Sequence, residues 1–356
     1  MTKNTTLWRA KIAKNDEFYT QLSDIENELR HYKEHFRWKT VLCNCDDPRV
    51  SNFFHYFAYN FEQLGLKRLI TTCYKNQNPN LFTLNESEKA VYLIYDGDKN
   101  WNNIPDVNEI WIHELKWDGD FRSEECIELL KQSDIVVTNP PFSLFREYIW
   151  QLVEYDKKFI IVGNPNAITY KEFFPLLRDN KVWVGYKSMG SDMLFGTSKE
   201  YEQELREKKK EGSGYRIVGG KFLARAAAIW FTNLDIKKRH EDLIMYKKYN
   251  PDEYRKYDNY DAIDVSQVSN IPCDYDGVMW VPITFLDKYN PEQFELVGRD
   301  GDLDLSITYD FFTPPSQDLC NKYKKANNTW RVQNAYMVSN GVAKTCFKRL
   351  FIRRKK

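Results

Sequence analysis

The sequence predicts an α/β protein built on a doubly wound, mostly parallel sheet. Short apolar stretches alternate with stretches of helical periodicity through the first half of the chain, which is typical of strand–helix–strand units. The 356 residues are enough for one large domain with an appendage, or for two domains. With 22 Phe, 23 Tyr and 10 Trp, the chain can form a sizeable core. Sheets of this kind bind ligands at the carboxyl ends of their strands.

The expected elements follow from local patterns. Apolar runs of strand length predict strands at 38–45, 67–74, 90–98, 109–117, 134–142, 158–163, 224–234 and 277–286. Helical periodicity predicts helices at 21–36, 50–65, 122–133 and 144–155. Gly65 would end the second of these helices, and Ser123 would cap the third.

The second half of the chain is organised differently. Residues 187–220 are highly charged and contain several glycines, which predicts an insertion or a loop. We therefore expect a core at 1–186, and the rest of the core sheet with a further region at 221–356. The net charge is only +1, but Lys344–Lys356 holds seven Lys or Arg among thirteen residues. Such a basic end is compatible with a surface that follows phosphates, or with a solvated face.

Several classes of protein are disfavoured. No apolar run approaches the roughly 18 residues needed to span a bilayer. The first 20 residues lack the apolar region of a secretory signal. The seven cysteines and five histidines are scattered without metal-ligand spacing, so we expect no metal site. Unpaired thiols favour a cytoplasmic protein.

The most informative stretch is Asn139-Pro140-Pro141-Phe142, which directly follows a predicted buried strand. A planar exocyclic amine is a poor nucleophile, because its lone pair is delocalised into the ring. Two acceptors with fixed directions would draw its nitrogen towards sp³ geometry. The side-chain carbonyl of Asn139 and the backbone carbonyl of Pro140 can be those acceptors, since the prolines stiffen the turn. Phe142 offers a ring on which a base can stack. The stretch favours methylation of such an amine by a methyl sulfonium.

The simpler alternative for this stretch is a proline-rich turn, because Asn-Pro is a common turn dipeptide. From amino-acid frequencies, Asn-Pro-Pro-aromatic would occur by chance in roughly one chain of this length in several hundred. Its position between a predicted strand and a predicted helix makes chance a weaker explanation still. We therefore favour the catalytic interpretation.

The residues upstream would then hold the methyl donor. Asp120 and Phe121 follow the predicted strand 109–117. The Asp120 carboxylate could accept a hydrogen bond from an adenine amino group, and the Phe121 ring could stack on the base. The alternative is an Asp-Gly turn with an incidental Phe.

A second group of donor-binding candidates follows the first predicted strand. Asn44 and Asp46 could meet the amino group of a methionine moiety. Ser51 and Asn52 begin the next predicted helix, whose N-terminus favours a carboxylate. Simple helix capping explains Ser51 and Asn52 equally well.

These stretches resemble the EcoRI-type adenine-specific DNA methyltransferases, a family of class I S-adenosylmethionine-dependent amino-methyltransferases. The resemblance runs from Lys14 to Gly298, most of the chain. Asn-Pro-Pro-Phe is shared with other amino-methyltransferases. The narrower signals are "VLCNCDDPRVSNFF" and "IPCDYDGVMWVPITFLDKYNPEQFELVG".

The resemblance implies a Rossmann-like class I methyltransferase fold, S-adenosyl-L-methionine as cofactor, and adenine N6 in double-stranded DNA as acceptor. Asn139 to Phe142 would be the catalytic tetrapeptide. Phe18, Tyr19 and Thr20 would border the methionine end of the cofactor. Asp120 and Phe121 would contact its adenine.

The order of the motifs also implies that catalysis and DNA recognition belong to different parts of the chain. Residues 1–186 would form the SAM-binding and catalytic core, and 221–356 would include the DNA target-recognition region with its basic end. The target adenine would be flipped out of the duplex to reach the tetrapeptide. A restriction endonuclease acting on the same DNA site would be a cognate partner, without having to form a complex.

The chain departs from the wider class in two places. "CDDPRVSNF" stands where the class has a glycine-rich loop. The predicted strand 67–74 ends without the acidic residue that usually binds the ribose of the cofactor. Asp96 and Asp98 are the candidates to replace it.

Three alternatives remain. An RNA methyltransferase, acting on adenine N6 or guanine N2 of ribosomal RNA, would use the same tetrapeptide but usually carries an RNA-binding appendage. A nuclease is suggested by Pro105-Asp106 and Glu114-Leu115-Lys116, which resemble a PD-(D/E)xK metal site, although so short a pattern recurs by chance. A non-catalytic DNA-binding module would keep the fold without turnover, and the intact tetrapeptide argues against it.

Overall fold

The computed structural model describes residues 19–45, 51–72, 90–100, 102, 105, 109–299, 311, 313, 316–326, 337–344 and 348–355. The chain divides into two compact units. Unit 1 consists of Met1–Pro165 and Val184–Ile236, and unit 2 of Asn166–Trp183 and Lys237–Lys356. The ranges expected from the sequence, 1–186, 187–220 and 221–356, divide the chain by function and stay a prediction.

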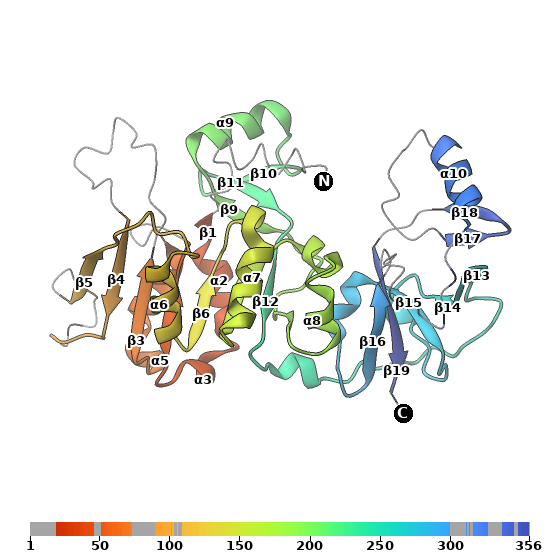
Figure 1. Cartoon of the computed structure of the whole chain (residues 1–356), viewed down its shortest axis with the longest axis horizontal. Coiled ribbons are helices and arrows are strands. Elements are labelled where there is room, and N and C mark those ends of the chain that lie inside the picture. The colour runs from red at the N-terminus through yellow and green to blue at the C-terminus, as the bar shows by residue number, and fades with distance from the viewer. Residues whose placement is uncertain are drawn as a thin grey trace. The chain divides into compact units, whose positions relative to one another are not determined.

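Unit 1 contains an eight-stranded sheet with the strand order β5-β4-β3-β2-β6-β7-β12-β8 (Figure 1). The strands are β2 (Thr40–Cys43), β3 (Arg68–Thr72), β4 (Val91–Tyr95), β5 (Ile110–Glu114), β6 (Ile135–Thr138), β7 (Lys158–Gly163), β8 (Trp183–Val184) and β12 (Ile229–Thr232). Every residue of β2 and β6 is buried, as expected for central strands covered on both faces.

The sheet is mixed, whereas the sequence predicted a mostly parallel one. The central strands β3, β2, β6 and β7 pair in parallel. On one side β4 and β5 pair antiparallel, and on the other side β12 pairs antiparallel with β7. A parallel pair needs a long crossover connection, usually helical. Among the residues that the structure describes, no helix lies between β4 and β5, so the two strands form an antiparallel pair.

Helices cover both faces of this sheet. In Figure 1, α6 (Glu124–Gln132) and α7 (Phe145–Glu154) lie in front of the strands, and α2 (Leu22–Leu29) lies behind them. The predicted helix 21–36 is divided into α2 and α3 (Lys33–Phe36), and the predicted helix 50–65 into α4 (Asn52–Tyr59) and α5 (Phe61–Leu64). Gly65, with a φ of 61°, ends α5, and Ser123 caps α6, both as predicted. No helix in the described part of the chain is long and apolar enough to cross a membrane.

A second sheet of unit 1 is antiparallel, with the order β1-β9-β11-β10. Its strands are β1 (Tyr19–Thr20), β9 (Met193–Gly196), β10 (Tyr215–Val218) and β11 (Lys221–Ala226). Residues 187–220, where we expected an insertion or a loop, thus contain two strands and the helix α9 (Lys199–Lys208). The charges of α9 form i,i+4 ion pairs, Glu202 with Arg206 and Glu204 with Lys208, which support a helix without an apolar stripe.

A buried carboxylate joins α2 to the chain that leads into β9. Glu28 is 1% exposed and accepts hydrogen bonds from the backbone N–H groups of Tyr186 at 2.6 Å and Lys187 at 2.8 Å. The Tyr32 hydroxyl donates to the same carboxylate at 2.8 Å. Because β9 pairs with β1, this junction also fixes the position of Tyr19 and Thr20.

Unit 2 contains a five-stranded sheet with the order β13-β14-β15-β19-β16. Its strands are β13 (Lys256–Tyr257), β14 (Tyr260–Asp264), β15 (Val278–Pro282), β16 (Phe294–Arg299) and β19 (Arg349–Arg354). The unit also includes α8 (Phe174–Arg178), α10 (Gln317–Ala326) and the hairpin of β17 (Met337–Ser339) and β18 (Val342–Lys344). Across both units, the described residues form 3-10 helices at Phe142–Leu144, Pro165–Thr169, Lys237–His240, Val268–Asn270 and Ile283–Lys288.

Six of the thirteen residues of the basic end, Arg349–Arg354, form an internal strand of unit 2. β19 lies between β15 and β16, and its residues Leu350, Phe351 and Ile352 are buried. Its arginines pair with carboxylates of the same unit, namely Arg349 with Asp264, Arg353 with Glu295 and Arg354 with Asp276. These ion pairs offset the charge of the three arginines, and a role of the basic end in following phosphates stays a prediction.

The burial of Tyr56 in α4 predicts a loss of stability in alkali. Burial, and then the charge of Glu26, raise the pKa of Tyr56 to about 12. Between pH 10 and this value the unfolded tyrosine loses its proton while the folded one keeps it. The free energy of unfolding therefore falls as the pH rises, by up to about 1.4 kcal/mol per pH unit for this group.

We expect Tyr56→Phe to reduce this alkaline loss of stability by about 1–2 kcal/mol over that interval. The measurement is urea unfolding between pH 8 and 11.5. Tyr59→Phe, at a position 63% exposed on the same helix, is the control. Equal pH slopes for the two variants would contradict the prediction.

Candidate active site

The tetrapeptide Asn139 to Phe142 leaves the sheet at the end of β6 and leads directly into α7. Asn139 is 6% exposed and Pro140 is buried, while Pro141 and Phe142 are half-buried. Phe142 opens a 3-10 turn, closed by a 2.9 Å hydrogen bond from the Leu144 N–H to the Pro141 carbonyl. The two prolines cannot continue the ladder of the sheet, so the chain turns at this point.

The end of β2 lies beside the end of β6. The two strands pair in parallel, with Leu42 opposite Val136, so Asn44 comes next to Thr138. The Thr138 hydroxyl donates a hydrogen bond to the backbone carbonyl of Asn44. Asn44, 5% exposed, is thus held at the edge of the sheet from which the tetrapeptide leaves.

A buried tyrosine of α7 fixes the side chain of Asn44. The Tyr148 hydroxyl donates a hydrogen bond to Oδ1 of Asn44. Burial raises the pKa of Tyr148 well above its ordinary value, so its hydroxyl stays protonated and remains a donor. This hydrogen bond occupies one of the two lone pairs on Oδ1 of Asn44. Asn44 is the residue expected to meet the methionine amino group.

The beginning of α4 lies against β1. Ser51 accepts a hydrogen bond from the Phe53 N–H at 3.2 Å, which is the capping role considered as the simpler alternative. Nδ2 of Asn52 donates to the backbone carbonyl of Thr20 at 2.7 Å. Three candidate residues from two sequence motifs therefore meet at one place.

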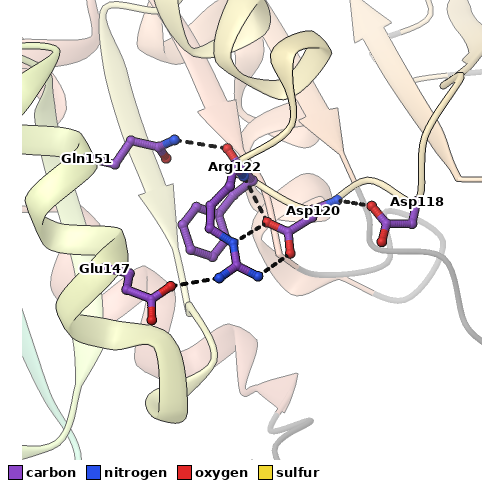
Figure 2. A network of polar contacts seen from close by, with 6 residues as sticks. Asp118, Asp120, Arg122, Glu147 and Gln151 are labelled. Carbon is purple, nitrogen blue, oxygen red and sulfur yellow. Dashed lines mark hydrogen bonds and ion pairs between the residues drawn. The ribbon is translucent and has the colours of Figure 1, made fainter.

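Asp120 and Phe121 precede α6 in the chain. Figure 2 shows Asp120 and Arg122 of this loop beside α7, whose Glu147 accepts a hydrogen bond from Arg122. Both carboxylate oxygens of Asp120 accept hydrogen bonds from the guanidinium of Arg122. Phe121 is 6% exposed, and its ring meets that of Tyr148 edge to face, with centroids 5.0 Å apart. The structure thus shows structural partners for both residues, and their contact with a cofactor stays a prediction.

The candidates for the ribose-binding acid are wrong by position. β4 runs antiparallel to β3, so the residues after β4 lie near the amino end of β3. Asp96 forms an ion pair there with Arg68, the first residue of β3, at 2.7 Å. Asp98 follows on the same side, with its N–H 3.3 Å from a carboxylate oxygen of Glu62. A ligand at the carboxyl end of β3 would lie at the opposite edge.

Some of the expected residues cannot be placed. Phe18, Asp46 and Asp106 lie outside the described residues. Glu114 of the suggested nuclease pattern ends β5, and the Lys116 N–H donates to Glu125. Among the described residues, no three His, Cys, Asp or Glu side chains are arranged to hold a metal ion.

Sequence reasoning missed Tyr148 and Gln151, which link the expected site residues. Both are buried on α7, three positions apart on one helix face. The side-chain nitrogen of a buried Asn or Gln needs a hydrogen-bond acceptor. Nε2 of Gln151 has one, because it donates to the Phe121 carbonyl at 3.0 Å. A polar pair on the buried face of a predicted amphipathic helix is a signal that could have identified them.

The chain belongs to the family described as adenine-specific methyltransferase EcoRI, whose model matches residues 6–355. The protein is accordingly an adenine-specific DNA methyltransferase that uses S-adenosyl-L-methionine. This membership argues against the RNA methyltransferase and nuclease alternatives.

Individual relatives agree with the family. The chain is 50% identical over 315 residues to the type II methyltransferase M.EcoRI of Escherichia coli, covering 86% of this chain and 94% of that protein. It is 42% identical over 294 residues to the type II methyltransferase M.MgeORF184P of Mycoplasma genitalium, and 40% identical over 295 residues to M.MpnI of Mycoplasma pneumoniae. Each of these two alignments covers 81% of this chain and 84% of the relative. No solved structure matches the chain.

Two buried hydroxyls fit a polar cofactor at this edge of the sheet. The Oγ1 atoms of Thr20 and Thr71 are buried and have no hydrogen-bond partner among the described residues. Thr71 pairs in register with Cys43, the neighbour of Asn44, and Thr20 is held by Asn52. A buried hydroxyl without a partner costs about 1–3 kcal/mol, which a bound polar ligand would remove.

Gly163 at the end of β7 is required for the position of α7. A Cβ atom there would lie 2.4 Å from Cε2 of Phe145, the first residue of α7. We expect Gly163→Ala to lower the free energy of unfolding by about 1–3 kcal/mol and to lower the methyl-transfer rate, because α7 follows the tetrapeptide closely in the chain. Gly190→Ala, where the nearest atom would be 3.7 Å away, is the control in urea unfolding and turnover assays. Wild-type stability of Gly163→Ala would contradict the packing argument.

Proposed function

We propose that the enzyme methylates adenine N6 at a specific site of duplex DNA, after flipping the target base out of the helix. The observation that carries the proposal is the position of Asn139 and Pro140. They follow a buried strand at the edge of the sheet where Asn44 and, through Asn52, Thr20 are also held. We infer a Rossmann-like class I fold, because the parallel centre of the mixed sheet has helices on both faces.

The catalytic step mainly needs hydrogen-bond acceptors for the adenine amine. The side-chain oxygen of Asn139 and the carbonyl of Pro140 would accept hydrogen bonds from the two N–H groups of the adenine amine. The residues that the structure describes donate no hydrogen bond to the Pro140 carbonyl, so it remains available. Asn139 is buried, and acceptors act more strongly away from water. Phe142 would stack on the flipped base.

The cofactor would supply the methyl group on a positively charged sulfur. The adenine nitrogen would gain the methyl group and lose one proton to solvent, and the sulfur would leave as a neutral thioether. Phe18, Tyr19, Thr20, Asn44, Asp46, Ser51 and Asn52 would surround its methionine end. Asp120 and Phe121 would contact its adenine. The buried hydroxyls of Thr20 and Thr71 support this placement.

The remaining proposals concern DNA and cellular context. Residues 1–186 would act as the catalytic core, and 221–356 would include target recognition. M.EcoRI, the relative named above, is a type II methyltransferase, so we propose that this enzyme also protects a site cut by a cognate endonuclease. The free cysteines of the described residues suit a cytoplasmic enzyme.

The test is transfer of labelled methyl groups to mixed-sequence duplex DNA and, separately, to structured RNA. Mass analysis of the product nucleosides identifies the acceptor atom. We expect N6-methyladenine in DNA. Label in RNA alone would overturn the proposed substrate while keeping the tetrapeptide chemistry. Cofactor binding without any transfer to DNA that contains all short sites would favour the non-catalytic alternative.

A further inference from the structure

Arg122 lies between the two halves of the proposed active site. One half is the loop of Asp120 and Phe121, proposed to contact the cofactor. The other half is α7, which continues directly from the tetrapeptide. Figure 2 shows the Arg122 guanidinium between Asp120 of the loop and Glu147 of α7.

On the cofactor side, Arg122 fixes the carboxylate of Asp120. Oδ1 accepts hydrogen bonds from Nε of Arg122 at 2.9 Å and from its backbone N–H at 2.8 Å. Oδ2 accepts from Nη2 at 2.6 Å. The Asp120 N–H in turn donates to Oδ1 of Asp118 at 3.1 Å. A carboxylate held at both oxygens keeps one orientation, so it does not have to be ordered when a ligand binds.

On the catalytic side, the same guanidinium reaches α7. Its Nη1 donates to Oε2 of Glu147 at 2.7 Å. Gln151, one helical turn further along, donates to the Phe121 carbonyl at 3.0 Å. Tyr148, on the same helix, contacts the Phe121 ring edge to face. Three residues of α7 therefore contact the loop. A shift of the loop would therefore move α7, and with it the tetrapeptide.

We propose that Arg122 is a positioning residue that couples the orientation of the cofactor-binding loop to that of the catalytic tetrapeptide. This inference rests on the proposed roles of Asp120 and Asn139. Arg122 itself need not touch either substrate. It acts through Asp120 on cofactor affinity and through Glu147 on the alignment of the tetrapeptide.

If Arg122 had a purely structural role, its loss would lower the melting temperature, and binding and rate would fall only as a consequence. Arg122 and Glu147 are 48% and 56% exposed, and exposed ion pairs contribute little to stability. The short hydrogen bonds from the forked Arg122 guanidinium instead suit a residue that fixes the orientation of the Asp120 and Glu147 carboxylates. Loss of Arg122 should therefore change binding and rate with little change of melting temperature.

The experiment measures three quantities for the full-length protein and its variants. They are the Kd for S-adenosyl-L-methionine by calorimetry, the single-turnover methyl-transfer rate at saturating cofactor and DNA, and the melting temperature. Arg122→Ala removes both links, and Glu147→Gln removes the charge of the link to α7 alone. Glu128→Gln is the matched control, because Glu128 is 63% exposed and forms an ion pair with Lys131 on α6.

We expect Arg122→Ala to raise the cofactor Kd about tenfold, as for loss of one oriented, charge-assisted contact. Its melting temperature should stay within about 3 °C of the wild type. Glu147→Gln should leave the Kd within about twofold and lower the single-turnover rate about fivefold, since small misalignments are costly. Glu128→Gln should change neither quantity.

Either of two results would overturn the inference. One is wild-type Kd and rate in Arg122→Ala. The other is a fall in its melting temperature large enough to account for both losses. Failure of the proposed function would look different, because the wild type would then transfer no methyl group to adenine in duplex DNA. The Kd comparison between Arg122→Ala and the wild type would decide the cofactor part of the inference even in that case.

Discussion

Replacement of Asn139 by alanine is expected to lower the methyl-transfer rate by about 10²–10³-fold, the usual cost of removing one oriented group that stabilises a transition state. The side chain is proposed to accept one of the two hydrogen bonds that make the adenine amine nucleophilic. Because Asn139 is buried, water does not readily replace the lost acceptor. Cofactor affinity should change little, since the proposed cofactor contacts come from other loops. Single-turnover kinetics and calorimetry measure the two effects separately.

Asn139→Asp provides the comparison for this prediction. Aspartate keeps an acceptor oxygen at the same place but brings a negative charge into a buried position. It should retain more of the rate than alanine does, although less than the wild type. An alanine variant within tenfold of the wild-type rate would exclude Asn139 as an essential acceptor. Equal loss of cofactor binding and rate would indicate a disturbed fold instead.

Local signals in the sequence were sufficient for much of unit 1. The apolar run Ile135 to Thr138 is a buried strand, and Ser123 and Gly65 mark helix ends as predicted. Strand direction was not available from the same signals, because an apolar run such as Val91 to Tyr95 looks alike in parallel and antiparallel pairs. The helix α9 was missed because its charges pair with one another instead of accompanying an apolar face.

The active site was predictable only in part, because local sequence patterns do not reveal contacts between residues far apart in the chain. The tetrapeptide is a contiguous motif with a chemical rationale, so it could be recognised from its residues. The contact between Tyr148 and Asn44 joins residues 104 positions apart, and no local pattern announces it. The same is true of Arg122 with Glu147, 25 positions apart. Contacts of this kind depend on how the strands and helices pack.

Removal of residues 349–356 is expected to unfold unit 2. The deletion takes β19 from between β15 and β16 and leaves both neighbours without a partner on that side. It also removes Leu350, Phe351 and Ile352, which are at most 3% exposed. Burying three such side chains contributes about 5–9 kcal/mol, comparable with the whole stability of many domains. Thermal unfolding and limited proteolysis of the shortened chain should show the loss of an ordered unit.

This outcome changes how the basic stretch must be tested for DNA binding. A shortened chain would lose affinity for DNA through unfolding, whether or not its charges contact phosphates. Lys355→Ala leaves β19 intact and removes an exposed charge, so it should keep the wild-type melting temperature. If Lys355 contacts a phosphate, this variant also lowers the slope of log affinity against log salt by about one. A shortened chain that unfolds like the full-length protein would show that β19 is dispensable for unit 2, against the burial of Phe351 between Tyr260 and Phe311.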